Sequence, residues 1–129
     1  MNRSRFLNER GGAATAAAFR RIALALDGVV EGGHHGHADF RVGGRVFATL
    51  GYPDTSHGMV KLTPEQQRAQ IQDEPEAFVT VKGKWGEGGA TLVRLRAADE
   101  ETLGQALTLA WQNVAARQPA RGSARRKTR

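Results

Sequence analysis

Hydrophobic and polar positions follow a helical period near the start of the chain and a two-residue period after it. Apolar residues recur at helical spacing in the first segment: Phe19, Ile22, Ala23 and Leu26. This spacing predicts a helix over residues 13–27 that ends at Gly28. Beyond residue 28, short alternating runs separated by glycine predict strands over residues 39–42, 45–50 and 59–62.

Gly43-Gly44 separates the first two of these runs. Two glycines suit a tight hairpin turn that requires positive φ angles, so we expect the two runs to pair as antiparallel strands. In a regular second strand Val46, Ala48 and Leu50 share one face, and Phe47 lies on the other.

Thr63-Pro64-Glu65-Gln66 is typical of a helix start. Thr63 can accept a hydrogen bond from the Gln66 amide, the Gln66 side chain can reach back to Thr63, and proline fits the first helical position. The helix that follows, to about Asp73, is polar, and we expect it to be largely solvated.

The second half of the chain predicts two strands, over residues 78–82 and 91–95, with a glycine-rich connection over residues 83–89 between them. A last helix is expected from Asp99, with Glu100 and Glu101 at the positive end of its dipole. Pro119 marks its end. The buried face of this helix is expected to hold Leu103, Leu107, Ala110, Trp111 and Val114.

In chain order these elements read α-β(3)-α-β(2)-α. Short connections favour antiparallel pairing, so we expect a two-layer α+β domain whose five-stranded antiparallel sheet carries the helices on one face. We expect residues 1–12 to be a flexible N-terminus, residues 13–117 to form the domain, and residues 118–129 to be a disordered basic tail.

Composition restricts the function classes. The 129 residues include no cysteine, which excludes disulfides, thiolate metal sites and a catalytic thiol. No apolar run is long enough to span a membrane, so we expect a cytoplasmic protein without a membrane partner. The net charge of +6 lies entirely in residues 117–129, which hold six cations and no acid. These cations are Arg117, Arg121, Arg125, Arg126, Lys127 and Arg129.

The sequence resembles the MmcQ/YjbR family in three stretches. Residues 23–50 read ALALDGVVEGGHHGHADFRVGGRVFATL, residues 60–62 are similar to the family's lysine-bearing strand, and residues 82–95 read KGKWGEGGATLVRL, similar to its tryptophan-bearing hairpin. The resemblance covers about residues 14–116. It implies a fold similar to that of secretion chaperones, with the element order given above. It also implies DNA binding, because the family's two hairpins resemble a double wing.

Under this hypothesis the wings are the hairpins of residues 39–50 and 78–95, which would neutralise phosphates with little base readout. The candidate residues are Arg41, Arg45, Lys82, Lys84, Trp85 and Arg94, together with Arg121, Arg125, Arg126, Lys127 and Arg129 of the tail. Two alternatives stay open: the cations protect strand edges and keep the protein soluble, and Trp85 packs in the core, which we favour for this tryptophan. Residues 13–116 have a net charge of −2, which argues against a dedicated DNA-binding module.

Other chemistry has weaker support. His35 and His37 share a face of an extended segment and are metal-ligand candidates with Glu31 or Asp39, although polar loop residues explain them better. Lys61 is a candidate for binding an anion in a cleft, or a surface lysine. Ser56 precedes His57, but neighbours on an extended chain point apart.

We find no motif for a catalytic nucleophile, a nucleotide loop or a metal site, and we expect neither enzymatic activity nor a cofactor. The sequence therefore predicts a weak, sequence-independent DNA-binding protein. The alternative is a non-catalytic module that binds a protein or a small ligand through the face or edge of its sheet.

Overall fold

The computed structural model describes residues 12–34 and 37–116. The predicted flexible N-terminus, except Gly12, and the predicted disordered tail lie outside the described residues. None of the helices in the described part is long and apolar enough to cross a membrane.

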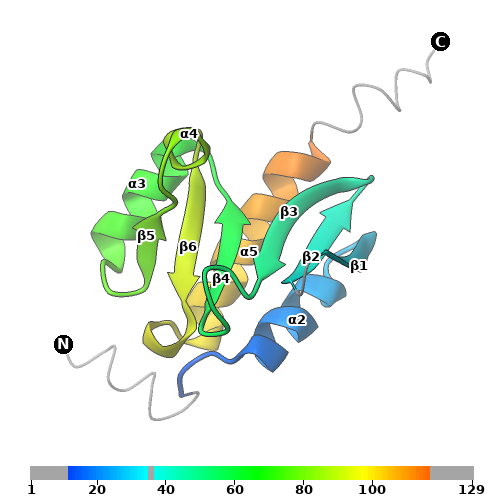
Figure 1. The fold of residues 1–129 in the computed structure, drawn as a ribbon, viewed down its shortest axis with the longest axis horizontal. Helices are drawn as coiled ribbons and strands as arrows, with labels where there is room; N and C mark the ends of the chain where they lie inside the picture. The colour runs from blue at the N-terminus through cyan, green and yellow to red at the C-terminus, as the bar shows by residue number, and fades with distance from the viewer. Residues whose placement is uncertain (1–11, 35–36, 117–129) are drawn as a thin grey trace.

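The described residues form one antiparallel sheet with helices packed against it (Figure 1). The sheet order is β1-β2-β3-β4-β6-β5. The elements are α2 (Ala16–Ala25), β1 (Val29–His34), β2 (His37–Val42), β3 (Arg45–Leu50), β4 (His57–Lys61), α3 (Pro64–Asp73), β5 (Phe78–Thr80), α4 (Lys84–Glu87), β6 (Ala90–Arg94), the 3-10 turn η1 (Leu95–Ala97) and α5 (Glu100–Ala115). In Figure 1, α2 and α5 lie behind the sheet, and no long helix covers its front. The α+β class with an antiparallel sheet is therefore confirmed.

The predicted strand number of five is wrong, because β1 adds a sixth strand at one edge. The segment holds Gly32 and Gly33, whose strand propensity is low, so its composition gave no strand signal. Pairing decides its structure: β1 pairs with β2 along its whole length. The Glu31 carboxylate also accepts hydrogen bonds from the Arg20 guanidinium at 3.0–3.1 Å, which ties the strand to α2.

The predicted facing of Phe47 is wrong, because β3 contains a β-bulge. Ala48 lies opposite Phe40 and Val46 lies opposite Arg41, so Phe47 is the extra residue between them. The bulge turns Phe47 towards the helices, where it is fully buried together with Ala48.

Each long helix begins at a side-chain cap. Thr15 caps α2, which begins at Ala16, three residues after the predicted start, and Asp99 caps α5. At α3 the predicted capping box is confirmed: Thr63 Oγ1 accepts from the Gln66 amide at 3.1 Å, and Gln66 Oε1 accepts from the Thr63 amide at 3.0 Å.

The main core lies between the sheet and the two helices behind it. The largest apolar side chains in it are Phe19, Phe40, Phe47, Phe78, Leu103 and Leu107. Gly58 of β4 makes room for the Phe19 ring, since a Cβ there would lie 2.4 Å from that ring. Trp111 is half-buried at the rim of this core, and its Nε1 donates to the Asp27 carbonyl at 2.9 Å.

Candidate nucleic-acid interface

The register of β4 and β6 determines which side chains face away from the helices. Val60 and Thr91 lie opposite each other, and both are fully buried on the helix side. Side chains alternate between the two faces of a strand, so the neighbouring pairs point to the other face. These pairs are Met59 with Leu92, Lys61 with Ala90, and His57 with Arg94. We call this face the open face.

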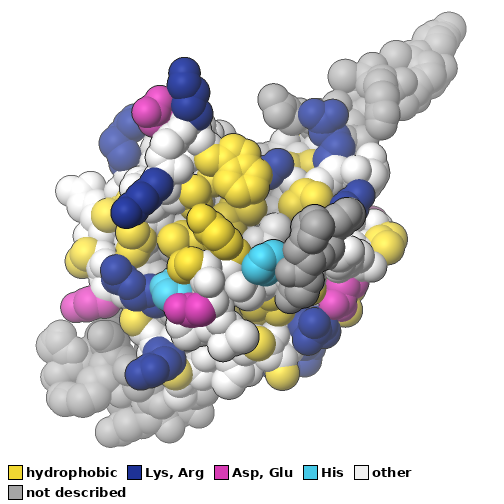
Figure 2. Space-filling model, in the orientation of Figure 1, with side chains coloured by type: hydrophobic (Ala, Val, Ile, Leu, Met, Phe, Trp, Pro, Cys, Tyr) yellow, Lys and Arg dark blue, Asp and Glu magenta, His cyan; other side chains and the backbone are white. Residues whose placement is uncertain are grey.

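A small apolar cluster stabilises the centre of the open face. It contains Met59, Val81 and Ala90, which are all buried, with Leu92 packed against them. Figure 2 shows this face: hydrophobic side chains gather at its centre, with Lys and Arg side chains around part of them and His and acidic side chains directly below.

The charges of the domain are divided between the sheet and the helical layer. Residues 37–62 and 78–97, which form β2 to β6 and their connections, hold seven Lys and Arg against three Asp and Glu. The three long helices, β1 and their connections hold three Lys and Arg against nine Asp and Glu, in residues 12–36, 63–77 and 98–116. The near-neutral total predicted from the sequence therefore combines a basic sheet with an acidic helical layer.

The structure places the predicted phosphate-binding cations in different surroundings. Arg41 donates from Nε and Nη2 to Asp39 at 2.9 and 3.2 Å, and these hydrogen bonds raise the pKa of Arg41. Arg94 donates from Nη1 to the Glu76 carbonyl at 3.0 Å. Arg45, beside the hairpin turn, is exposed, as are Lys82 and Lys84. The β2–β3 wing thus carries an internal carboxylate that offsets one of its two cations.

The second wing differs from the predicted hairpin. β5 and β6 pair as expected, but β5 ends at Thr80 and the glycine-rich connection contains the one-turn helix α4. Trp85 lies on α4 with 57% of its surface exposed, so the favoured prediction that it packs in the core is wrong. The physical reason is that Gly86 is the buried residue of this turn, and its preceding neighbour therefore points outward.

A buried glutamine fixes α4 in place. Gln67 Nε2 of α3 donates to the carbonyls of Gly86 and Ala90, both at 3.0 Å, and so connects α4 to the start of β6. The sequence missed this residue, because α3 was expected to be largely solvated. A glutamine among other polar residues carries no signal that distinguishes a buried position.

Trp85 borders a cleft of about 650 Å³ between α4, the end of β4, the start of α3 and the end of α5. The charged and aromatic lining residues are Lys61, Lys84 and Trp85. The structure therefore brings together the candidate anion-binding lysine of β4 with two of the candidates on the second wing.

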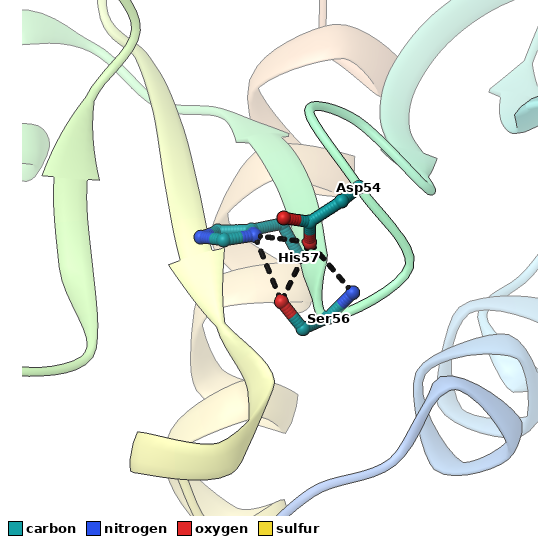
Figure 3. A network of polar contacts seen from close by, with 3 residues as sticks. All are labelled: Asp54, Ser56 and His57. Atoms are coloured by element: carbon teal, nitrogen blue, oxygen red, sulfur yellow. Dashed lines mark hydrogen bonds and ion pairs between the residues drawn. The ribbon is translucent and has the colours of Figure 1, made fainter.

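At the other end of β4, the loop before His57 forms a polar network (Figure 3). Asp54 Oδ1 lies 2.6 Å from Ser56 Oγ, 2.9 Å from the Ser56 amide and 2.9 Å from His57 Nδ1. Ser56 and His57 were predicted to point apart, but the turn brings Ser56 Oγ to 3.2 Å from His57 Nδ1.

This network does not have the geometry of a nucleophilic triad. In a triad the serine and the carboxylate contact opposite nitrogens of the imidazole. Here both contact Nδ1, so the serine hydroxyl is placed to donate to Asp54 rather than to lose its proton to His57. Its chemical effect is to stabilise the Asp54 carboxylate.

Hydrogen bonds from the Ser56 hydroxyl, then from His57 and the Ser56 amide, lower the pKa of Asp54 from 3.8 to about 2. A lowered pKa in the folded state stabilises the protein above pH 3.8, and this contribution is lost as the pH falls towards 2. In a carboxyl NMR titration we expect Asp54 to titrate near 2, and Ser56→Ala to raise this midpoint. Asp54→Asn identifies the resonance, and a native midpoint at 3.8 contradicts the prediction.

The structure describes one of the two metal-ligand candidates, His37. His35 lies outside the described residues. His37 Nδ1 is buried without a hydrogen-bond partner among the described residues, and its ring makes an edge contact with Tyr52 at 6.2 Å between centroids. Within residues 12–34 and 37–116, no group of three or more His, Asp or Glu could hold a metal ion.

Comparisons with known proteins agree with this architecture. A solved structure of the Deinococcus radiodurans protein DR2400, which has a DUF419 domain, superposes with a TM-score of 0.66 at 19% sequence identity, over 80% of each chain. This likeness shows the fold. No match is found among curated proteins. The YjbR family model matches residues 24–113, from the end of α2 to the last turns of α5. Because this match covers well over half of the chain, the protein belongs to the YjbR family.

Proposed function

We propose that this protein binds DNA weakly and without sequence readout, through the open face of its sheet and the basic tail. The observation that carries the proposal is the division of charge: seven cations and three acids in the sheet segments, against the reverse excess in the helical layer. Phosphates are attracted to the basic side and repelled by the acidic side, which orients the nucleic acid on the protein.

The aromatic residues support the same choice of ligand. The large hydrophobic residues exposed in the described part of the chain are Leu24, Val30, Tyr52 and Trp85. Tyr52 lies in the loop between β3 and β4, and Trp85 lies on α4. Nucleic-acid-binding surfaces combine cations for the phosphates with exposed rings on which bases stack.

A protein-interaction module is the second candidate, and the low exposure of the apolar residues at the centre of the open face gives it less support. A protein docking surface needs a contiguous exposed apolar patch. The three central residues of the open face, Met59, Val81 and Ala90, are each less than a tenth exposed. The proposed function therefore rests on charge and stacking rather than on apolar docking.

A matched pair of triple variants tests the proposal by fluorescence anisotropy with labelled DNA of about 20 nucleotides, titrated from about 25 to 300 mM salt. The sheet variant carries Arg45→Gln, Lys82→Gln and Lys84→Gln. We expect it to weaken binding and to reduce the salt slope by about 2 on single-stranded DNA, because each neutralised phosphate contributes about 0.7.

The control variant replaces the three cations of the helical layer, Arg20, Arg21 and Arg68, by glutamine, so the net charge falls by the same amount. We expect its slope to equal that of the unmodified protein. Arg20 and Arg21 form exposed ion pairs with Glu31 and Glu100, whose loss costs at most about 1 kcal/mol of stability. Equal slopes for both triple variants, or no binding at low salt, overturn the proposal.

A further inference from the structure

The cleft beside α4 has a rigid wall. An added Cβ at Gly86 would lie 1.6 Å from the Val81 carbonyl oxygen, and one at Gly89 would lie 1.9 Å from the Leu62 carbonyl oxygen. Gly86 and Gly89 thus pack closely against the backbone of Val81 and Leu62, the residues that follow β5 and β4. Gln67 also donates to the carbonyls of Gly86 and Ala90. The backbone that carries Trp85 is therefore held in place before a ligand binds, so the stacking surface is preorganised.

The ligand chemistry follows from what surrounds the indole. Trp85 exposes more than half of its surface, and its indole offers a π face on which a planar ring can stack. The charged residues of the lining are Lys61 and Lys84, and no carboxylate occurs among the lining residues that the structure describes. A stacking surface beside two ammonium groups suits a flat ring that carries a phosphate.

The hydrogen bonds already made by the uncharged polar side chains at the cleft predict little discrimination between bases. Asn113 Nδ2 already donates to the Lys61 carbonyl at 3.1 Å and to Gln66 Oε1 at 2.8 Å. Gln66 Oε1 also accepts from the Thr63 amide. Because these amides satisfy one another, base edges have few partners in the cleft, and stacking alone is tolerant of sequence.

Ala116, the last described residue, also lines the cleft. The chain continues from Ala116 into residues 117–129, which hold six cations in sequence. Their charge has the same sign as that of Lys61 and Lys84, so the tail is a poor occupant of the cleft. It is instead suited to contact further phosphates of a ligand bound there.

We propose that this cleft holds one unpaired nucleotide, with its base against Trp85 and its phosphate beside Lys61 and Lys84. The inference rests on the proposed function for its choice of ligand and deepens it. A base inside a duplex cannot stack on a side chain in a cleft without being extruded, which costs a few kcal/mol. The protein should therefore prefer single-stranded DNA, or the frayed end of a duplex, to an intact double helix.

The test measures the binding of fluorescently labelled AMP to the full-length chain by anisotropy. Unlabelled AMP, adenosine and ribose 5-phosphate are then added as competitors. We expect AMP to compete best, since it alone carries both the ring and the phosphate. Trp85→Ala should weaken AMP binding by at least about tenfold, and Trp85→Phe by no more than about threefold, because phenylalanine keeps a stacking ring. Lys84→Gln should weaken the binding of AMP but not that of adenosine, which carries no phosphate.

Tyr52→Ala is the matched control: it removes the other large aromatic ring exposed in the described part of the chain, and Tyr52 is not a lining residue of the cleft. We expect it to leave AMP binding unchanged. Absence of AMP competition up to about 10 mM, or equal AMP affinity for Trp85→Ala and the unmodified protein, overturns the inference. DNA binding without AMP binding refutes this inference alone. AMP binding without DNA binding refutes the proposed function and leaves a nucleotide site.

Discussion

Gly86→Ala is expected to lower the free energy of unfolding by about 3 kcal/mol. A Cβ at position 86 would lie 1.6 Å from the Val81 carbonyl oxygen and 2.6 Å from its carbon. Both atoms belong to the backbone, so no side-chain rotation relieves the overlap. α4 must move away from the sheet, and this separates the Gly86 carbonyl from Gln67 Nε2. A buried amide that loses a partner adds to the cost.

Gly104→Ala is the matched substitution with the opposite expected sign. Gly104 lies inside α5, and a Cβ there meets nothing within 4 Å. Alanine should therefore stabilise the protein by about 0.5–1 kcal/mol, through helix propensity and a less flexible unfolded chain. Urea unfolding followed by circular dichroism measures both variants. A Gly86→Ala protein as stable as the unmodified one shows that α4 is not held against the sheet.

The parts of the fold that the sequence predicted well are those determined by local interactions. Thr63 and Gln66 lie three residues apart, and their side chains satisfy each other's amides whatever surrounds them. Asp99 caps α5 in the same way, through the Thr102 amide at 2.8 Å. Gly43 and Gly44 both adopt the positive φ angles that their hairpin turn requires. Such motifs need no knowledge of the rest of the chain.

The features that were missed depend on residues distant in sequence. β1 exists because β2 offers it a complete partner, not because Gly32 and Gly33 favour a strand. Phe47 faces the core because of a bulge, which alternation alone does not reveal. Gln67 is buried because two carbonyls, 19 and 23 residues away, need its amide.

The candidate site shows the same division. The sequence identified Lys61, Lys84 and Trp85 separately. They lie around one cleft only because the end of β4 pairs with the start of β6, where Lys61 is opposite Ala90. The total charge of the domain also hides how its charges are distributed. A net charge of −2 over residues 13–116 argued against nucleic-acid binding, whereas the fold places the acids mainly in the helical layer and β1 and the cations mainly in the other five strands.

Neutralising the tail is expected to have the largest effect on DNA binding. The variant replaces all six cations of residues 117–129 by glutamine and keeps the chain length. If each cation contacts one phosphate, the salt slope on single-stranded DNA falls by about 4, so the affinity advantage of the unmodified protein shrinks roughly 250-fold between about 50 and 200 mM salt. Anisotropy titrations at several salt concentrations measure both quantities. An unchanged slope shows that the tail does not contact the phosphates.

Ligand length separates the contribution of the tail from that of the cleft. A mononucleotide fills the cleft and offers no further phosphate, so the neutral-tail variant should bind AMP within about twofold of the unmodified protein. On longer DNA the tail and the cleft contact the same strand, and each raises the effective concentration of the other. Trp85→Ala should therefore weaken binding of about 20 nucleotides in both tail backgrounds. If neutralising the tail weakens AMP as much as it weakens DNA, the tail contributes to the cleft itself, and the two sites are not separate.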